Sequence, residues 1–390
     1  MDDREVLELL RAMVRAPSHP GVPRQEEAAV RALEAFLRER DIPPTLTEVR
    51  EGRPNLVASL AAKEPGPHLL FCGHTDTVAP NAETSVDMFA ARVENGRLHG
   101  RGSVDMKGAV AAMAAALVLL KESGGPASGR VTLAAVIDEE MESLGAEALI
   151  ASGFKADGAV IGEPTLNRVA IGHKGLEWFE VGFEGRAAHG SMPEAGVNAI
   201  AAAAHFISLV EKELVPAFER RRDPVLGLPA INMGTISGGQ QPSMVAAGCR
   251  LQLDRRWVTT ETIEQVFDDI EALLARVREA RPGLKTRLIR MPGGMATMLH
   301  GPLVIDQLHP LVVSALGAFE DLGRPSPPTT VFQAWTDGAL LSREAAIPTV
   351  IWGPGALDLA HSPEESIALD DVYLAARLYA AAARRFTARR

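Results

Sequence analysis

The sequence predicts an α/β protein in which a doubly wound, mostly parallel sheet carries helices on both faces and is interrupted by a smaller inserted domain. Short apolar runs typical of buried strands alternate with helical patterns near both ends of the chain. In the middle, apolar and polar residues alternate within the strands, which is typical of a sheet with one covered face. The chain has 390 residues, more than one core usually supports.

The first part of the chain contains most elements of the parallel sheet. Apolar residues recur at helical spacing from Val6 to Val14, which predicts an amphipathic helix. Three short apolar runs predict buried strands at His68 to Cys72, Val131 to Ile137 and Ala159 to Gly162. The Ala-rich segment from Lys107 to Lys121 predicts a buried helix, because its apolar run is shorter than the about 20 residues that span a membrane.

The elements predicted between residues 176 and 292 follow the order β-α-β-β-α-β, which is typical of a ferredoxin-like domain. The strands are expected at Leu176 to Phe183, Ala230 to Ser237, Cys249 to Asp254 and Leu284 to Arg290, and the helices at Val197 to Glu213 and after a cap at Thr260. The first pattern then resumes with a helix at Pro310 to Leu322, a strand at Thr349 to Trp352 and a helix at Asp370 to Arg385. We therefore expect one domain from residues 1–175 and 293–390, with residues 176–292 inserted.

The charge and cysteine content limit the classes of function. A formal net charge of −10 argues against nucleic acid and anionic membranes, which attract basic surfaces. Cys72 and Cys249 form no Cys-x-x-Cys motif and do not suggest a disulfide framework. No basic segment followed by an apolar one marks a signal peptide at the N-terminus. These features predict a cytoplasmic protein that acts on small molecules.

Histidines and carboxylates follow the ends of several predicted strands. In chain order they are His74 and Asp76, Glu139 and Glu140, Glu163, and, after a Gly-Pro-Gly loop, His361. Ligands of open α/β sheets bind beyond the carboxyl ends of the strands, so we expect these side chains at one rim. Asp105 precedes the buried helix in a glycine-rich segment that can turn toward the same rim.

This set of side chains predicts a metal-dependent hydrolase. Histidines together with carboxylates suit a borderline metal such as zinc. The candidate ligands are His74, Asp105, Glu140, Glu163 and His361, and this number favours two ions over one. Two ions about 3.5–4 Å apart can activate a bridging water and polarise a carbonyl.

Taken one at a time, these residues also have plain structural interpretations. The pair Glu139 and Glu140 could be the acidic start of a helix. Asp105 could be a helix N-cap, and Glu163 could belong to a turn before a proline. His361 and His74 could be ordinary loop histidines. Only their joint placement after buried strands favours the metal site.

Several short motifs occur in a characteristic order along nearly the whole chain. They are Gly73–Val78, Gly100–Gly108, Asp138–Glu140, Gly162–Thr165, His189–Pro193 with Gly196–Ala199, Asn232–Gly234, and Gly353–Gly355 with His361–Pro363. This ordered set resembles the M20 family of metallopeptidases and amidohydrolases, which includes acetylornithine deacetylase and succinyl-diaminopimelate desuccinylase. The resemblance implies that the inserted domain is a lid and dimerisation domain.

The resemblance also implies a role for each candidate ligand. Asp105 would bridge two zinc ions, with Co²⁺ or Mn²⁺ as alternatives. His74 and Glu163 would bind one ion, and Glu140 and His361 would bind the other. The peptide bond between Asp105 and Met106 would be cis.

Further roles follow from the same resemblance. Asp76 would orient His74, and Glu139 would be the general base. In a homodimer, His189 would reach into the partner's site and stabilise the oxyanion, although it could also be a plain surface histidine. Arg256, which could instead be a solvated strand residue, would bind the substrate together with Asn232 and Gly355.

The expected reaction is hydrolysis of the amide bond of an N-acyl amino acid by a water that bridges the two zinc ions. A metallo-exopeptidase, either a dipeptidase or a carboxypeptidase, is the alternative within enzymes. A non-catalytic metal-binding homologue is a third interpretation, but every implied ligand and the base are present. Trp335 stands where desuccinylases carry small hydroxyl residues, which argues against succinyl-diaminopimelate as the substrate.

Overall fold

The computed structural model describes residues 1–81 and 87–388, and the chain divides into two compact units. The first unit comprises Met1–His173 and Leu303–Arg390, and the second comprises Lys174–Pro302. Residues 293–302, which the sequence analysis assigned to the outer domain, belong by their contacts to the second unit. Two hydrogen bonds hold them there, from Arg290 to the Met298 carbonyl and from the Leu176 amide to the His300 carbonyl.

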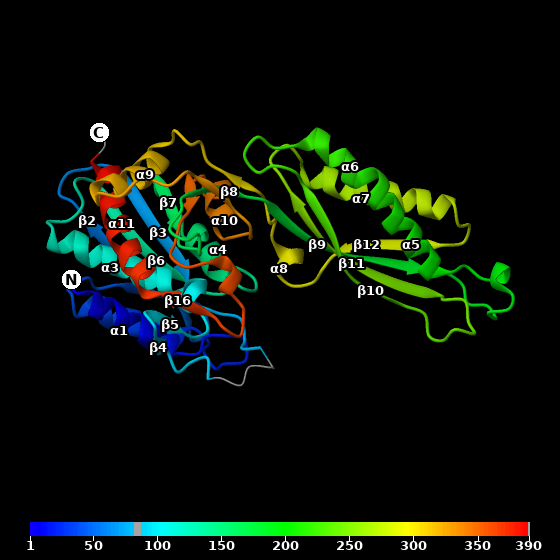
Figure 1. The fold of residues 1–390 in the computed structure, drawn as a ribbon, viewed down its shortest axis with the longest axis horizontal. Coiled ribbons are helices and arrows are strands. Elements are labelled where there is room, and N and C mark those ends of the chain that lie inside the picture. The colour runs from blue at the N-terminus through cyan, green and yellow to red at the C-terminus, as the bar shows by residue number, and fades with distance from the viewer. Residues whose placement is uncertain (82–86, 389–390) are drawn as a thin grey trace. The chain divides into compact units, whose positions relative to one another are not determined.

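A nine-stranded sheet runs through the first unit (Figure 1). Its order is β1-β2-β6-β3-β7-β15-β8-β13, with β14 also paired to β8. The strands are β1 Thr45–Arg50, β2 Arg53–Ala61, β3 His68–His74, β6 Arg130–Val136, β7 Gly158–Ile161, β8 Ala170–His173, β13 Leu303–Val304, β14 Thr330–Phe332 and β15 Thr349–Ile351. The central strands β6, β3, β7 and β15 run parallel, so their carboxyl ends share one rim. The outer strands β1, β2 and β13 pair antiparallel.

Helices cover both faces of this sheet, which confirms the predicted fold class. The helices α3 (Gly108–Glu122) and α11 (Leu369–Thr387) pack together on one face (Figure 1). On the other face, Leu149 of α4 and Leu341 of α10 join a core cluster with Leu70 of β3. The remaining elements are α1 Asp3–Val14, α2 Glu27–Arg38, α4 Leu144–Ala151, α9 Pro310–Asp321, α10 Gly338–Arg343, and a small sheet of β4 Arg92–Glu94, β5 Arg97–His99 and β16 Ser366–Ala368.

The helical stretch Ser103–Glu122 is long and strongly apolar. Within the described ranges it is the one helix long and apolar enough to cross a membrane. However, 94% of its most apolar window is buried inside the protein. It is therefore a core helix, as the sequence predicted, and it packs directly behind the rim of the sheet.

The second unit is a four-stranded antiparallel sheet with the order β10-β11-β9-β12. Its elements follow the predicted β-α-β-β-α-β order and are β9 Gly175–Glu184, α5 Ala199–Leu209, β10 Ala230–Gly238, β11 Gly248–Trp257, α7 Ile263–Glu279 and β12 Lys285–Arg290. Apolar residues of β9 such as Phe179 and Phe183 pack against Phe206 of α5 and Ile270 of α7. The alternation seen in the sequence thus buries one face of the sheet and leaves the other face open.

The N-cap of α7 is Thr262 and not Thr260, as the sequence analysis expected. The Thr262 hydroxyl accepts a hydrogen bond from the Gln265 amide at 3.2 Å, which is the contact that defines a cap. The Thr260 hydroxyl instead donates to the Arg221 carbonyl at 2.6 Å. Either threonine suits a cap by type, and the backbone path decides between them.

Candidate metal centre

The parallel strands deliver the predicted side chains to one rim of the first unit. His74 is the last residue of β3, and Glu163 follows β7. Glu139 and Glu140 lie in the turn after β6, and Asp105 lies just before α3. His361 reaches the same place from the loop after β15, because its contacts are with Asp105 and Glu140.

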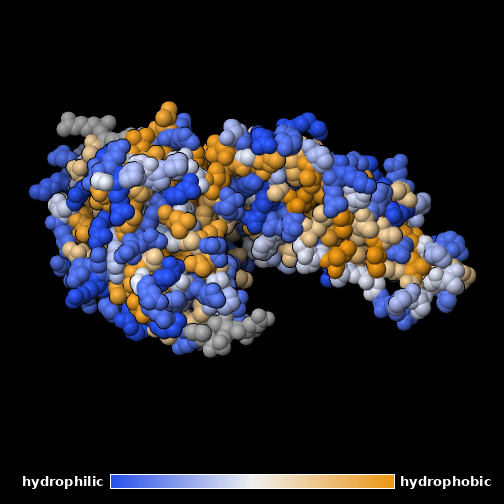
Figure 2. All heavy atoms as spheres, in the orientation of Figure 1, coloured by the Kyte–Doolittle hydropathy of each residue, from blue (hydrophilic) through white to orange (hydrophobic). Residues whose placement is uncertain are grey.

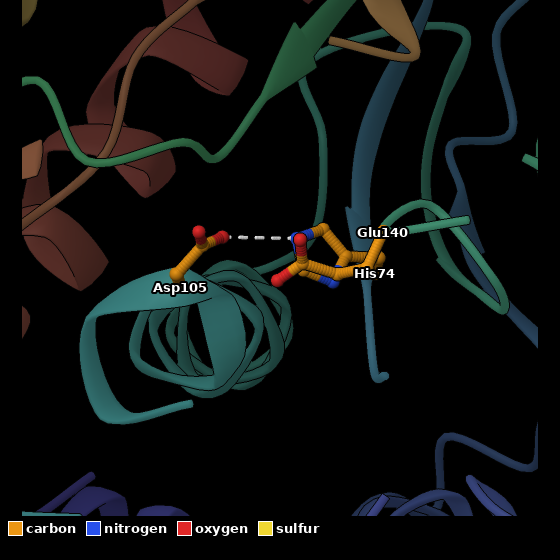
Figure 3. A group of neighbouring side chains, drawn as sticks. All are labelled: His74, Asp105 and Glu140. Atoms are coloured by element: carbon orange, nitrogen blue, oxygen red, sulfur yellow. Dashed lines mark hydrogen bonds and ion pairs between the residues drawn. The ribbon is translucent and has the colours of Figure 1, made fainter. Parts of the chain in front are cut away.

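Asp105 lies between the two histidines and contacts both. Its Oδ1 is 3.0 Å from Nε2 of His74 and its Oδ2 is 3.1 Å from Nε2 of His361. The Nε2 atom of His74 is also 3.7 Å from Glu163, and that of His361 is 3.0 Å from Glu140. Figure 3 draws His74, Asp105 and Glu140 converging on one point. The side chains thus form two groups that share Asp105, the same grouping that the family resemblance implied.

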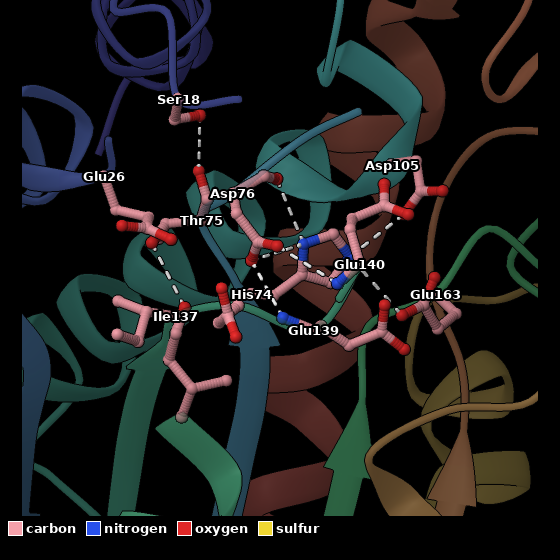
Figure 4. A network of polar contacts seen from close by, with 12 residues as sticks. Ser18, Glu26, His74, Thr75, Asp76, Asp105, Ile137, Glu139, Glu140 and Glu163 are labelled. Atoms are coloured by element: carbon pink, nitrogen blue, oxygen red, sulfur yellow. Dashed lines mark hydrogen bonds and ion pairs between the residues drawn. The ribbon is translucent and has the colours of Figure 1, made fainter. Parts of the chain in front are cut away.

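Asp76 contacts both the His74 ring and the backbone of Glu139 and Glu140 (Figure 4). Its side chain is fully buried, and its Oδ1 is 3.4 Å from Nδ1 of His74. The two carboxylate oxygens also accept hydrogen bonds from the amides of Glu139 and Glu140, at 3.2 and 3.0 Å. Asp76 therefore positions the histidine ring and the turn that carries both glutamates.

A buried cluster of ion pairs fixes the turn after β6. Asp138 starts the turn with a left-handed φ of 70°, and its carbonyl accepts hydrogen bonds from the amides of Met141 and Ser143. Arg53 of β2 donates to the Asp138 carboxylate at 2.6 Å and to Glu26 at 2.5 and 2.7 Å. The turn is consequently not the start of a helix, which removes the plain interpretation of the glutamate pair.

The glutamates at the rim are crowded and poorly solvated. Burial raises the pKa of Glu139 and that of Glu163 well above the usual value. Burial also raises the pKa of Glu140, and the negative charge of Asp105 adds to this shift. Each carboxylate would therefore release its proton more readily if positive charge were placed beside it.

The two histidines contact carboxylates that favour their protonated forms. Hydrogen bonds with Asp105 and Glu140 raise the pKa of His361 to about 10. Burial opposes the charged form of His74, but hydrogen bonds with Asp105 and Asp76 keep its pKa well above the usual value. Burial likewise opposes ionisation of Asp105, but the hydrogen bonds from His361 and His74 outweigh it and lower the Asp105 pKa.

The donor set fits divalent cations. Ligand atoms of His74, Asp105 and Glu140 lie within 4.8 Å of one another. Beside them is a cavity of about 220 Å³, and no lysine or arginine is among the described residues that line it. Buried carboxylates require compensating charge, and histidine nitrogen with carboxylate oxygen is a ligand set suited to zinc and similar ions. The ligand roles themselves remain a prediction.

The surroundings of Asp105 exclude its interpretation as a helix cap. The N-cap position of α3 is Lys107, and no side chain caps that helix end. The peptide bond between Asp105 and Met106 is cis, as the resemblance predicted. The carboxylate of Asp105 is thus free of backbone capping and faces the histidines.

Two buried charged residues at the site escaped the sequence analysis. Glu365 accepts hydrogen bonds from the amides of Val104 and Asp105 at 3.0 and 3.4 Å, and from Arg101 at 2.6 Å. Arg101 also donates to the carbonyl of His361 at 3.3 Å. The signal was present, because Arg101 lies in the glycine-rich segment and Glu365 follows His361 closely, but their pairing spans more than 250 residues.

The remaining predicted site residues are Gly355 in the first unit and three residues of the second unit. Gly355 is in the first unit with a φ of 86°, and its carbonyl accepts a hydrogen bond from the Leu166 amide. His189, Asn232 and Arg256 belong to the second unit. His189 is exposed, with its Nδ1 2.7 Å from the Ser191 hydroxyl.

Asn232 and Arg256 lie on adjacent strands of the second unit, on the open face of its sheet. Asn232 pairs in register with Asp254, and Ala230 pairs with Arg256. Two hydrogen bonds, at 2.7 and 2.9 Å, join the Arg256 guanidinium to the Asp254 carboxylate. Arg256 is therefore not a freely solvated cation, because the Asp254 carboxylate already orients its guanidinium.

The fold and the site together define a two-unit α/β protein with a histidine–carboxylate cluster suited to two divalent cations. A sequence profile of peptidase family M20/M25/M40 matches residues 70–385. The chain belongs to this family of metal-binding hydrolases.

Curated relatives match along most of the chain. It is 29% identical to acetylornithine deacetylase of Proteus mirabilis, over 93% of this chain and 91% of the relative. It is 27% identical to a probable succinyl-diaminopimelate desuccinylase of Staphylococcus epidermidis, over 88% of each chain. Both relatives are named for removing an acyl group.

Solved structures share the fold over nearly the full length. Aminopeptidase PepT of Bacillus cereus superposes with a TM-score of 0.81 at 19% identity, over 99% of each chain. The YXEP protein of Bacillus subtilis, described as a dinuclear metal-binding peptidase, gives a TM-score of 0.72 at 15% identity over 98% of each chain. These likenesses show the fold that the sequence predicted.

Proposed function

We propose that this protein is a two-zinc hydrolase that cleaves the amide bond of N-acyl amino acids. The observation that carries the proposal is the placement of Asp105 between His74 and His361. Glu139 lines the cavity beside these residues. The names of the sequence relatives favour deacylation. The dinuclear peptidase among the structural neighbours supports two ions.

The proposed ligands are the two groups that share Asp105. His74 and Glu163 would hold one cation, and Glu140 and His361 would hold the other. Such cations lower the pKa of a bound water and polarise the substrate carbonyl. Co²⁺ or Mn²⁺ would suit the same nitrogen and oxygen donors.

Glu139 is the proposed general base. It lines the cavity but is not paired with either histidine in the cluster, whereas Glu140 contacts His361. Asp76 fixes the backbone of Glu139, and burial gives its carboxylate a raised pKa and hence a strong affinity for a proton. Glu139 would take a proton from the attacking water and pass it to the leaving nitrogen.

The second unit would contribute substrate contacts. Arg256 and Asn232 would bind the carboxylate of the amino acid, with the substrate replacing Asp254 on the arginine fork. His189 would donate a hydrogen bond to the developing oxyanion, from the partner subunit of a homodimer. The edge strand β10, discussed below, offers a surface for such a dimer.

Exopeptidase activity is the second candidate, because the structural neighbours include an aminopeptidase. Both reactions hydrolyse an amide and need the same metal centre. A panel of acetyl, formyl and succinyl amino acids together with dipeptides separates the two candidates by comparison of kcat/KM.

The decisive experiment replaces the proposed base and measures metal and activity together. We expect Glu139→Gln to retain two zinc ions per chain while kcat falls by about 10²–10⁴-fold or more. Zinc content is measured by mass spectrometry of the dialysed protein, and kcat with the best substrate of the panel.

The matched control is Glu142→Gln, a change in the same turn at a side chain that pairs with exposed Arg50. This control should keep both zinc and activity. A wild-type protein that binds zinc but hydrolyses nothing in the panel would instead favour a non-catalytic metal-binding homologue.

A further inference from the structure

The residues that line the cavity beside the metal centre form two chemically different sets, which we call its charged half and its apolar half. One half consists of Asp105, Glu139, Glu140, Glu163 and His361. The other half is formed entirely by apolar side chains, which are Phe332, Ala334, Trp335, Leu357 and Ala360. A carbonyl held at the charged half would therefore place one of its substituents against the apolar half.

The apolar half is an extension of the hydrophobic core. Phe332, the last residue of β14, is only 5% exposed and belongs to a core cluster with Ile351 of β15. Ala334 and Leu357 pack against the same cluster. Because these side chains rest on a packed core, the surface that they present to a ligand is fixed before binding.

Trp335, which lines the cavity, is held by contacts with neighbouring residues. Its ring lies edge-on to the ring of His173, with 6.2 Å between the centroids and an interplanar angle of 68°. The next residue, Thr336, contacts Nε2 of His173 at 3.2 Å and accepts a hydrogen bond from the Gly338 amide. The contacts of Trp335 and Thr336 with His173 of β8 thus fix the position of an apolar ring that lines the cavity.

The cavity has no partner for a second negative charge on the substrate. Its described lining contains no lysine or arginine, and its charged half is already rich in carboxylates. A succinyl group would bring its terminal carboxylate into this environment, where burial without a cation is costly. An acetyl group would leave most of the apolar surface uncovered.

We propose that this cavity selects N-acyl amino acids with an apolar acyl group longer than acetyl, and that Trp335 is the specificity-determining residue. The inference rests on the proposed function, in which the carbonyl of the acyl group is held beside the carboxylates and His361 of the charged half. The acyl group is then the substituent that meets Phe332, Ala334, Trp335 and Leu357. Linear acyl chains of four to about eight carbons and the benzoyl group have suitable chemistry.

The first experiment compares kcat/KM of the zinc-loaded full chain for acetyl, butanoyl, hexanoyl, benzoyl and succinyl derivatives of one amino acid. We expect kcat/KM to rise about four-fold for each methylene that the apolar half covers, so hexanoyl should exceed acetyl by at least ten-fold. Succinyl should be the poorest substrate. An acetyl or succinyl derivative that equals or exceeds hexanoyl would overturn the inference and leave the proposed deacylase function intact.

The second experiment tests Trp335 with three variants. Trp335→Ser should reduce the hexanoyl-to-acetyl ratio of kcat/KM by ten-fold or more, mainly through the KM of the hexanoyl substrate. Trp335→Phe should restore most of the ratio. Leu308→Ser is the matched control, because Leu308 is 81% exposed and lies outside the cavity, so its ratio should equal that of the wild type. An unchanged ratio in Trp335→Ser would overturn the role of Trp335.

A binding measurement separates this inference from the proposed function. Calorimetric titration of zinc-loaded Glu139→Gln with hexanoyl-glycine and acetyl-glycine reads the preference without turnover. If the wild type hydrolyses no acyl amino acid, the deacylase proposal fails, while tighter binding of hexanoyl-glycine would still support an apolar acyl site. Equal binding of the two ligands would overturn the site itself.

Discussion

Glu365 and Arg101 connect the backbones of two proposed metal ligands that are far apart in the sequence. Glu365 holds the amides of Val104 and Asp105, and Arg101 holds both Glu365 and the His361 carbonyl. Their side chains are 0% and 1% exposed. A buried pair with several hydrogen-bonded backbone partners fixes geometry more than it adds stability. We therefore assign these residues to the positioning of Asp105 relative to His361.

The positioning role of Glu365 and Arg101 can be tested by measuring the affinity for zinc. Glu365→Gln should weaken zinc binding by about 10–100-fold, the effect typical of residues that orient metal ligands. The affinity is measured by competition with a chelating dye, and circular dichroism verifies the fold.

Removing one partner of a buried ion pair can cost about 3–5 kcal/mol, so Arg101→Lys provides a milder variant that keeps the charge. Arg97→Lys is the control, because Arg97 contacts Ser366 instead of Glu365. Wild-type zinc affinity in both folded variants, Glu365→Gln and Arg101→Lys, would refute the positioning role.

At the scale of the element, the start of β9 and the segment after α8 (Gly294–Thr297) contain two buried groups with opposite pH behaviour. Burial lowers the pKa of His300 to about 4, and the charge of Arg290 adds to the shift. Burial raises the pKa of Glu177 to about 7, although Arg290 pairs with it. Both groups are in the second unit, so its stability depends on pH through them.

The signs of the two contributions are opposite. The folded state disfavours the proton on His300, so its stabilisation is complete above pH 6.5 and is lost as the pH falls toward 4. The folded state favours the proton on Glu177, so its stabilisation is complete below pH 4.5 and is lost as the pH rises toward 7. In the wild type the two effects largely cancel between pH 4.5 and 7.

His300→Gln should remove the contribution of His300 and leave that of Glu177. Relative to the wild type, the free energy of unfolding of the variant should increase by about 2 kcal/mol between pH 7 and pH 4.5. Urea denaturation of the full chain at several pH values measures the difference. A difference curve for His300→Gln that stays flat over this pH range would contradict the prediction.

At the scale of the whole molecule, β10 is an edge strand of the second unit with an unusual surface. Among the described strands it pairs only with β11. Ile236, Ile200 and Met244 in its neighbourhood are 53%, 43% and 39% exposed. Figure 2 shows hydrophobic residues gathered over the part of this unit where Figure 1 draws α5 and β11. Long edge strands with exposed apolar residues pair with other chains unless they are protected. The predicted homodimer would use this edge.

A charge on the edge should therefore prevent dimerisation. We expect Ile236→Lys to be monomeric in light scattering at concentrations where the wild type is a dimer. Val215→Lys changes an exposed apolar residue of α6 (Val215–Ala217) and should remain dimeric. If His189 serves the partner's site, Ile236→Lys also loses activity while zinc binding remains. A monomeric wild type would refute the homodimer.

The sequence by itself determined the features that depend on local patterns. Alternating and helical periodicities predicted the strands around His74 and the helix after Asp105, because each element buries one face or all of its surface. The placement of histidines and carboxylates after buried strands predicted the rim of the site, since parallel strands share a carboxyl end. The ordered motifs then predicted the family.

Only the tertiary structure decided which distant residues meet. Three features left no local pattern that could be interpreted, namely the antiparallel outer strands, the boundary at Pro302 and the ion pair of Arg256 with Asp254. Arg101 and Glu365 lie beside motifs that the sequence shows, but their pairing joins segments far apart in the chain. Their partners are chosen by the closure of the whole chain, in which a buried charge is tolerated only where another element supplies its counter-charge. Local sequence specifies what each segment can form, and packing specifies what it faces.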